Sequence, residues 1–68
     1  MDYKNELKQH RVIRKLSQSD LARETGIKQQ RISYYESGIH SPSIDDCIKL
    51  ADFYGISLDE LVGRDFFD

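Results

Sequence analysis

The fold of this chain is decided by residues 16–38, which read LSQSDLARETGIKQQRISYYESG. Ala22 stands four positions before Gly26, and the branched apolar Ile32 follows six positions after that glycine. Two helices that cross steeply over a short turn need a small side chain where they approach each other and a turn residue that tolerates positive φ. The second helix also needs an apolar residue on its inner side. The stretch therefore predicts two short helices joined by a tight turn at Gly26.

Serine and glycine residues mark where the helices begin and end. Three serines each stand three positions before an acidic residue, which is the spacing of a capping box: Ser17 with Asp20, Ser43 with Asp46, and Ser57 with Glu60. Glycines follow the apolar-periodic segments, where they can end a helix without steric penalty. The chain is therefore expected to be all-α, with five helices: roughly residues 2–14, Ser17 to Gly26, roughly 29–36, Ser43 to Gly55 and Ser57 to Gly63.

Apolar periodicity indicates which sides of two helices face inward. In the first helix, Tyr3, Leu7 and His10 share one side, so His10 is expected as a buried, hydrogen-bonded imidazole rather than a ligand. In the fourth helix, six residues are expected on the inner face: Ile44, Cys47, Ile48, Ala51 and Tyr54, with Leu50 beside them.

Length and composition allow one small domain with a thin core. Leu, Ile, Val and Phe make up 18 of the 68 residues, above the fraction of roughly 20% below which disorder is expected. No apolar run approaches the roughly 18 residues of a membrane-spanning helix, and no signal peptide opens the chain. The single cysteine, Cys47, excludes an internal disulfide. It suits a reducing cytosol, so a cytoplasmic protein is expected.

Charge is distributed unevenly between the two halves of the chain. Residues 1–31 carry eight basic and four acidic side chains, residues 32–68 carry two basic and eight acidic ones, and the formal net charge is −2. Such a molecule can present a positive face to a polyanion while it stays acidic overall. Chance scatter explains the charge pattern equally well when it is taken alone.

The sequence offers no catalytic or metal-binding pattern. It contains no G-x-S-x-G nucleophile elbow and no glycine-rich phosphate loop. The adjacent acids Asp45-Asp46 and Asp59-Glu60 diverge by about 100° on a helix, so they are interpreted as cap residues and a solvated face. Two histidines thirty residues apart and one thiol make no metal-ligand set. We therefore expect no enzyme, no cofactor and no metal.

Several motifs, taken in order, resemble the Cro/cI-type (XRE-family) helix-turn-helix domain of phage repressors and bacterial regulators. The matching stretches are residues 16–22 (LSQSDLA), 26–27 (GI), 32–38 (ISYYESG), 42–44 (PSI) and 50–61 (LADFYGISLDEL). The resemblance runs from about Leu7 to Gly63. It implies a five-helix, lambda-repressor-like DNA-binding fold whose second and third helices form the helix-turn-helix. Residues 1–68 are then a single domain, with a core at 7–63 and a short tail at 64–68.

Within this resemblance, the third helix is expected to lie in the major groove and to read base edges. Gln29 and Gln30 stand at its start, and a glutamine amide can pair with N6 and N7 of adenine. Ser33 and Tyr34 share the outward side with them, and Arg31 is expected to reach a guanine or a phosphate. The alternative is that these glutamines form a merely solvated face.

Other residues are expected to hold the DNA backbone. The resemblance implies that Gln18, at the start of the second helix, bonds a phosphate and braces Gln29. Lys28 is expected to contact a phosphate, and it lacks a side-chain acceptor with which to cap the third helix. In the loop after that helix, the backbone N–H groups of Gly38, Ile39 and His40 are also expected to bind the DNA backbone.

Two further positions carry structural expectations from the resemblance. Arg11 and Glu36 match a paired arginine and glutamate that link the first helix to the end of the third. The alternative for Arg11 is a phosphate contact. Lys15 occupies a turn position that is often glycine, so local strain is expected there.

The C-terminal residues are expected to contribute to a homodimer. A palindromic operator needs two recognition helices about 34 Å apart, and one short chain supplies only one. Four apolar residues are candidates for the dimer interface: Ile56, Leu58, Phe66 and Phe67. Folding of the two phenylalanines back onto the core is the alternative.

Two functions remain open on the sequence alone. The first is a sequence-specific transcriptional repressor that binds a double-stranded DNA operator. The second is an antitoxin-like module of the same fold, which neutralises a protein partner such as a toxin or an antirepressor and binds DNA secondarily. Gln29, Gln30 and the basic half favour the first function, and the acidic half favours the second. Neither a small-molecule effector nor a membrane is expected as a partner.

Overall fold

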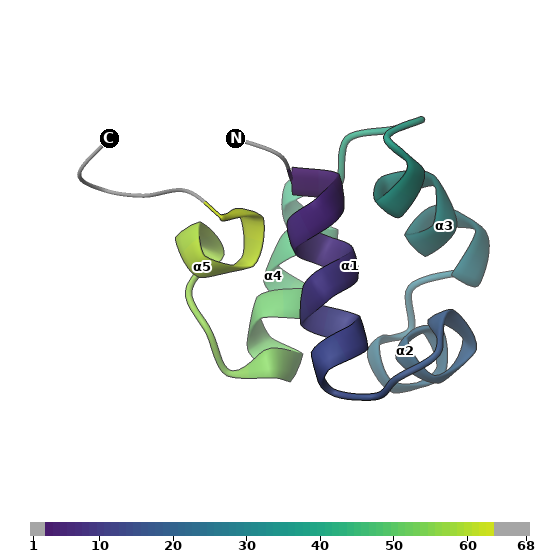
Figure 1. Cartoon of the computed structure of the whole chain (residues 1–68), viewed down its shortest axis with the longest axis horizontal. Helices are drawn as coiled ribbons and strands as arrows, with labels where there is room; N and C mark the ends of the chain where they lie inside the picture. Colours follow the sequence, from purple (N-terminus) through teal and green to yellow (C-terminus); the bar gives the residue numbers. More distant parts are fainter. Residues whose placement is uncertain (1–2, 64–68) are drawn as a thin grey trace.

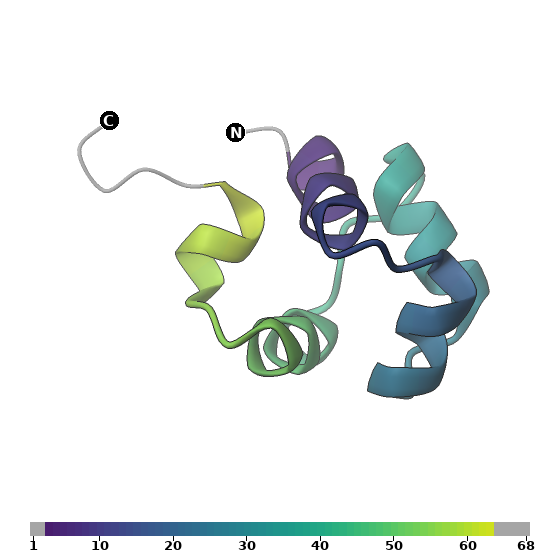
Figure 2. The same ribbon diagram turned by 60° about the horizontal axis from the view of Figure 1, so that its bottom comes forward.

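In the computed structural model, which describes residues 3–63, the chain forms five helices and no strand within that range (Figure 1). They are α1 (Tyr3–Ile13), α2 (Gln18–Thr25), α3 (Gln29–Ser37), α4 (Ile44–Tyr54) and α5 (Leu58–Val62). The all-α, five-helix prediction is confirmed. Helix α1 lies in the middle, with α5 packed on one side and α3 on the other, and α2 contacts both α3 and α4 (Figure 1 and Figure 2).

A small apolar core joins all five helices. Its buried members come from every helix and from the turn after α2: Leu7, Leu21, Ile27, Ile32, Tyr35, Cys47, Leu50, Ala51 and Leu61. Ile27 in the turn is only 1% exposed, and burying such a side chain contributes about 1.5–3 kcal/mol. The core therefore holds the turn and, with it, the angle between α2 and α3.

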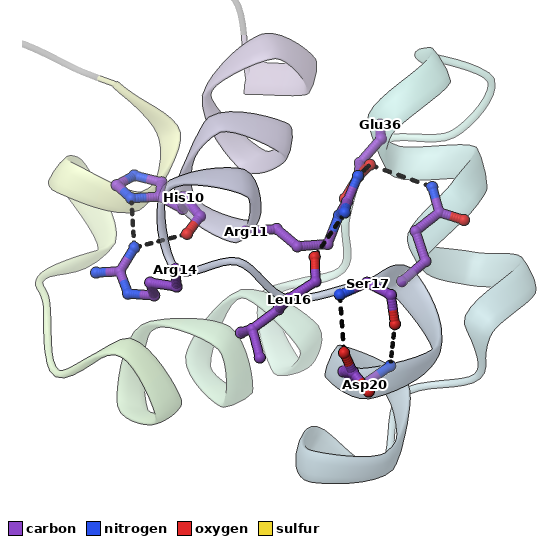
Figure 3. A network of polar contacts seen from close by, with 8 residues as sticks. His10, Arg11, Arg14, Leu16, Ser17, Asp20 and Glu36 are labelled. Atoms are coloured by element: carbon purple, nitrogen blue, oxygen red, sulfur yellow. Dashed lines mark hydrogen bonds and ion pairs between the residues drawn. The ribbon is translucent and has the colours of Figure 1, made fainter.

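The predicted serine caps are present at three helix starts. Ser17 Oγ accepts a hydrogen bond from the Asp20 N–H at 2.9 Å, and Asp20 Oδ2 accepts one from the Ser17 N–H at 3.0 Å (Figure 3). The bond from the Ser17 N–H to the carboxylate, with smaller contributions from the Ser17 side chain and Arg23, holds the pKa of Asp20 below its ordinary value. Ser57 and Glu60 form the same reciprocal box at α5. Such caps satisfy backbone N–H groups that a helix leaves unpaired at its start.

The turn between α2 and α3 has the predicted conformation. Gly26 lies at φ 78°, and its N–H donates to the Ala22 carbonyl at 2.9 Å. Ala22 is partly buried against the core, as a close crossing of two helices requires. Lys15, in the earlier turn after α1, lies at φ 59° and is the one non-glycine residue with positive φ between residues 3 and 63. The expected strain at Lys15 is therefore present.

The inner face of α4 differs from the prediction. Cys47, Leu50 and Ala51 are buried as expected, but Ile44 is 65% and Ile48 43% exposed. The helix is instead turned so that Asp46, 3% exposed, faces inward. The cause is polar, because partners on α3 bind the Asp46 carboxylate and hold this side of α4 against the protein.

His10 is hydrogen-bonded as predicted but only half-buried. Its Nε2–H donates to the Glu60 carbonyl at 2.8 Å, which ties α1 to α5. The Arg14 guanidinium lies beside it (Figure 3) and covers the Tyr54 ring at 4.2 Å from the ring centre. The expectation of full burial is therefore wrong.

Candidate nucleic-acid interface

The outward side of α3 carries the four polar residues expected to face DNA. Gln29 and Gln30 are exposed, and Ser33 and Tyr34 are half-buried beside them. They share this side because residues three and four apart on a helix are neighbours. The Gln30 amide donates to the Tyr34 hydroxyl at 2.7 Å, so one of the two glutamines is already held in a fixed direction.

The inward side of α3 is anchored by two buried residues, Ile32 and Tyr35. Lys28 precedes the helix and provides no side-chain hydrogen bond to cap it, as expected. The first N–H groups of α3 therefore lack a serine-type cap of the kind that opens α2, α4 and α5. A helix start without a side-chain cap can bind an anion, because its N–H groups and the helix dipole favour negative charge.

On one flank of α3, the predicted pair of Arg11 and Glu36 is confirmed. Arg11 Nε and Nη2 donate to the two carboxylate oxygens of Glu36 at 2.8 and 2.9 Å (Figure 3). Arg11 Nη1 also donates to the Leu16 carbonyl at 2.8 Å. The hydrogen bonds to Glu36 raise the pKa of Arg11. The pair fixes α3 against α1, which leaves Arg11 little freedom to move toward a phosphate.

Gln18 also binds Glu36, which differs from the expected brace to Gln29. Its Nε2 donates to Glu36 Oε1 at 3.2 Å. Gln18 therefore links the start of α2 to the end of α3 through the same carboxylate that Arg11 neutralises. Within the described part of the chain, no hydrogen bond joins Gln18 to Gln29, so Gln29 is positioned by the helix alone.

A polar groove of about 340 Å³ lies where α1, α2 and α3 meet. Its lining combines the residues just described with Ser37 at the end of α3 and with Lys8, which sequence reasoning missed: the full set is Lys8, Arg11, Gln18, Ser33, Glu36 and Ser37. Lys8 is exposed and stands one helical turn before Arg11 on the same side of α1. That spacing from a residue already assigned was the signal that could have identified Lys8.

The loop after α3 does not have the free N–H groups that were expected. The N–H groups of Gly38 and Ile39 donate to the Tyr34 carbonyl, the latter at 3.0 Å, and that of His40 points to the same oxygen at 3.5 Å. These groups complete the end of α3, and contact of Gly38, Ile39 and His40 with the DNA backbone stays a prediction. The His40 ring lies edge-on to Tyr34, with 5.1 Å between ring centres.

Lys4 places a positive charge next to this loop. A Cβ added at Gly38 would lie 3.0 Å from Lys4 Cδ and 3.7 Å from its Nζ. Lys4, Lys8 and Arg11 follow each other at helical spacing on the side of α1 that faces α3. Three cations of α1 therefore run along one flank of α3.

On the other flank of α3, Arg31 is bound to Asp46 of α4. Arg31 Nε donates to Asp46 Oδ2 at 3.0 Å, and Nη2 donates to Oδ1 at 3.1 Å. The Tyr35 hydroxyl also donates to Asp46. Burial and this hydrogen bond raise the pKa of Tyr35. Asp46 belongs to the cap of α4 as interpreted, but the expectation that it is solvated is wrong, because its carboxylate is buried and α3 supplies the partners that a buried carboxylate requires.

The expected dimer residues are only partly described. Ile56 is half-buried and packs against the core, and Leu58 on α5 is 40% exposed. Phe66 and Phe67 lie outside the described residues. Among residues 3–63 no helix is long and apolar enough to cross a membrane, and no group of three histidine, cysteine or acidic side chains is placed to hold a metal ion.

Comparisons with known proteins agree with this geometry. The family model described as helix-turn-helix matches residues 7–61. An HTH-type transcriptional regulator of Methanocaldococcus jannaschii is 36% identical over 58 residues, which cover 85% of this chain and 88% of that protein. The transcriptional repressor RstR of the cryptic phage CTXphi in Vibrio cholerae is 35% identical over 60 residues, covering 88% of this chain and 54% of the repressor.

A solved structure has the same arrangement of helices. The crystal structure of a transcriptional regulator from Listeria innocua superposes with a TM-score of 0.83 at 28% identity, and the match covers 94% of this chain and 60% of that one. This chain thus spans slightly more than half the length of the phage repressor and of this regulator. The chain belongs to the helix-turn-helix family of Cro/cI (XRE) type, and it is a transcriptional regulator with a DNA-binding domain.

Proposed function

We propose that this regulator is a repressor that binds a palindromic operator as a homodimer, with α3 of each copy in the major groove. The observation that carries the proposal is the outward side of α3, where two exposed glutamine amides stand between flanks that both carry cations. The floor of the DNA major groove offers base edges that form hydrogen bonds, and the phosphates line its walls. The residue types on α3 match this division.

Base reading is assigned to Gln29 and Gln30, with Ser33 and Tyr34 next to them. A glutamine amide both donates and accepts, so it can bind N6 and N7 of adenine together. Because the Tyr34 hydroxyl accepts a hydrogen bond from Gln30, it orients that amide before DNA is bound. We infer that Gln30 is the more selective reader of the two, since a held amide loses less freedom on binding.

Backbone contacts are assigned to the residues around α3. Gln18 and Lys8 line the groove between the first three helices, and a phosphate oxygen there would meet one ammonium group and one amide. Lys28 stands at the uncapped start of α3. Lys4 supplies the charge next to residues 38–40, whose own N–H groups are used within the fold.

Dimer formation is inferred from the size of the molecule. Its longest extent is 34 Å, and each copy carries one α3, whereas a palindrome presents two half-sites about 34 Å apart. Leu58 on α5 is exposed and stands two positions after Ile56. These residues, with Phe66 and Phe67, are the proposed contact between two copies.

One observation favours a second candidate function. Ile44 and Ile48 form an exposed apolar strip on α4, and the C-terminal half is strongly acidic. An antitoxin-like module would cover such a strip with a basic partner protein. A defined partner that buries Ile44 and Ile48 would support this function, and DNA binding would then be secondary.

Selection of bound duplexes from a random DNA pool tests the main proposal. We expect enrichment of an inverted repeat with half-sites one helical turn apart, each containing adenine at a position that depends on Gln29 or Gln30. Enrichment of a single half-site would contradict the dimer but not the reading by α3. No enrichment at low ionic strength would overturn the proposed function.

A further inference from the structure

Arg31 is the only residue of α3 in the described structure that forms an ion pair with α4. The pair is bidentate, with Nε and Nη2 on the two oxygens of Asp46. The side chain of Asp46 is 4% exposed, and that of Arg31 is 42% exposed. The carboxylate is therefore inside the protein, while part of the guanidinium remains open to solvent.

Asp46 itself is held in place by two further contacts. The Tyr35 hydroxyl donates to the same oxygen that Arg31 Nε uses. The Asp46 N–H donates to Ser43 Oγ at 3.1 Å, so the residue also belongs to the first turn of α4. A carboxylate fixed in this way can fix the plane of a guanidinium that binds it with two parallel bonds.

Arg31 has N–H donors that the pair with Asp46 does not use, and its side chain is partly exposed. A guanidinium has five N–H groups, and Asp46 takes one from Nε and one from Nη2. The others, on Nη1 and Nη2, form the end of the fork. Arg31 is one residue after Gln30, about 100° further round the helix toward α4. For a helix in the major groove, this position faces the wall of the groove, where the phosphates are.

We propose that Asp46 is a positioning residue that commits Arg31 to a backbone phosphate instead of a base edge. The inference rests on the proposed placement of α3 in the major groove. Asp46 binds one side of the guanidinium and leaves the end of the fork to bind two phosphate oxygens. Arg31 then sets how deeply α3 enters the groove, and the glutamines read the bases.

Because Asp46 is negatively charged, the proposal and a simple charge effect predict opposite changes of DNA affinity when its charge is removed. A carboxylate near DNA repels phosphate, so removing one by charge alone strengthens binding. Asp45→Asn is the matched control, because Asp45 is the exposed neighbour of Asp46 and carries the same charge. We expect Asp45→Asn to leave affinity for the selected operator unchanged or higher, and Asp46→Asn to lower it by roughly tenfold because Arg31 is no longer held.

The loss of operator affinity in Asp46→Asn must also depend on the presence of Arg31. We expect Arg31→Ala to weaken binding roughly tenfold on all sequences alike and to reduce the slope of affinity against salt by about one. Adding Asp46→Asn to Arg31→Ala should then cause no further loss, and the double variant leaves no unpaired buried charge. An Asp46→Asn effect equal to that of Asp45→Asn, or an undiminished effect in the Arg31→Ala background, would overturn the proposal.

A second variant keeps the test valid if Asp46→Asn does not fold. Arg31→Lys preserves the charge and leaves Asp46 in place, but lysine cannot bind a carboxylate and a phosphate through one rigid plane. We expect it to lose most of the affinity that Arg31→Ala loses, whereas wild-type affinity would contradict a positioned fork. A change of the selected base sequence with Arg31→Ala would show that Arg31 reads a base and would overturn the proposal. Absence of operator selection by the wild-type protein would instead overturn the proposed function itself.

Discussion

Glu36 on α3 accepts two hydrogen bonds from the Arg11 guanidinium on α1, at 2.8 and 2.9 Å, and the two side chains are only 6% and 12% exposed. The Gln18 amide binds the same carboxylate at 3.2 Å. One nearly buried charge pair therefore connects α1, the start of α2 and the end of α3. The orientation of the helix that faces DNA depends on this connection.

Removal of the Arg11 side chain should therefore destabilise the folded protein. Arg11→Ala leaves the Glu36 carboxylate nearly buried and without its cation, which we expect to lower the free energy of unfolding by about 3–5 kcal/mol. Urea denaturation followed by circular dichroism measures this value. Arg11→Met combined with Glu36→Gln should recover much of the loss, because no charge is then left unpaired. A loss below about 1 kcal/mol for Arg11→Ala would mean that the pair behaves as a solvated surface pair.

The two glutamines should control sequence preference. Gln29→Ala or Gln30→Ala should reduce discrimination by roughly 1–3 kcal/mol at one or two base pairs, measured by gel shift on randomised half-sites. Lys28→Ala should instead weaken binding to every sequence alike. Tyr34→Phe removes the hydroxyl that accepts the Gln30 hydrogen bond, so its effect should appear at the same base pair as that of Gln30→Ala. Unchanged preference in both glutamine variants would exclude base reading by them.

Lys8 should contribute to affinity but not to specificity. Lys8→Gln removes the ammonium group from the groove between the first three helices, and we expect the slope of log affinity against log salt to fall by about one. Lys49→Gln is the control, because Lys49 is an exposed lysine on α4. Fluorescence anisotropy at several salt concentrations gives both slopes. Equal effects of the two variants would show that only net charge matters.

The turn after α1 stores strain that can be relieved. Lys15 lies at φ 59°, where a Cβ is crowded by the backbone, whereas glycine adopts this conformation freely. Lys15→Gly should raise the free energy of unfolding by about 0.5–1 kcal/mol. Lys15→Ala keeps the Cβ and should show no such gain. A wild-type denaturation midpoint for Lys15→Gly would mean that contacts of the lysine offset the strain.

Tyr54 should make the protein sensitive to alkali. Burial raises the pKa of its hydroxyl from 10.0 to about 12, and the oxygen has no hydrogen-bond partner in the described part of the chain. Because the raised pKa belongs to the folded state, this stabilising contribution is complete below pH 10 and is lost as the pH rises toward 12.

The stability of Tyr54→Phe at several pH values isolates this effect. We expect the wild-type protein to lose more unfolding free energy than the variant between pH 10 and 12. The other three tyrosines are the same in both proteins, so the difference between the two stability curves reports on Tyr54. Parallel losses in both proteins would assign the alkaline instability to other groups.

The sequence by itself determined the helices and the family. Ser17, Ser57 and Gly26 specify helix ends through hydrogen bonds to residues at most four positions away, so their chemistry can be read locally. The spacing of Ala22, Gly26 and Ile32 predicted the crossing of α2 and α3. The pair of Arg11 and Glu36 came from the resemblance to the family, and the structure confirms it.

Only the tertiary structure decided which charged groups are free to meet DNA. Asp46 stands at a cap position, but the residues that bind its carboxylate stand 11 and 15 positions away, and no local sequence pattern predicts them. In the folded chain Asp46 is buried and paired with Arg31, while Ile44 on the same helix is exposed. The physical reason is that a helix cap is satisfied within one turn of chain, whereas a buried carboxylate is stable only where distant segments bring donors to it.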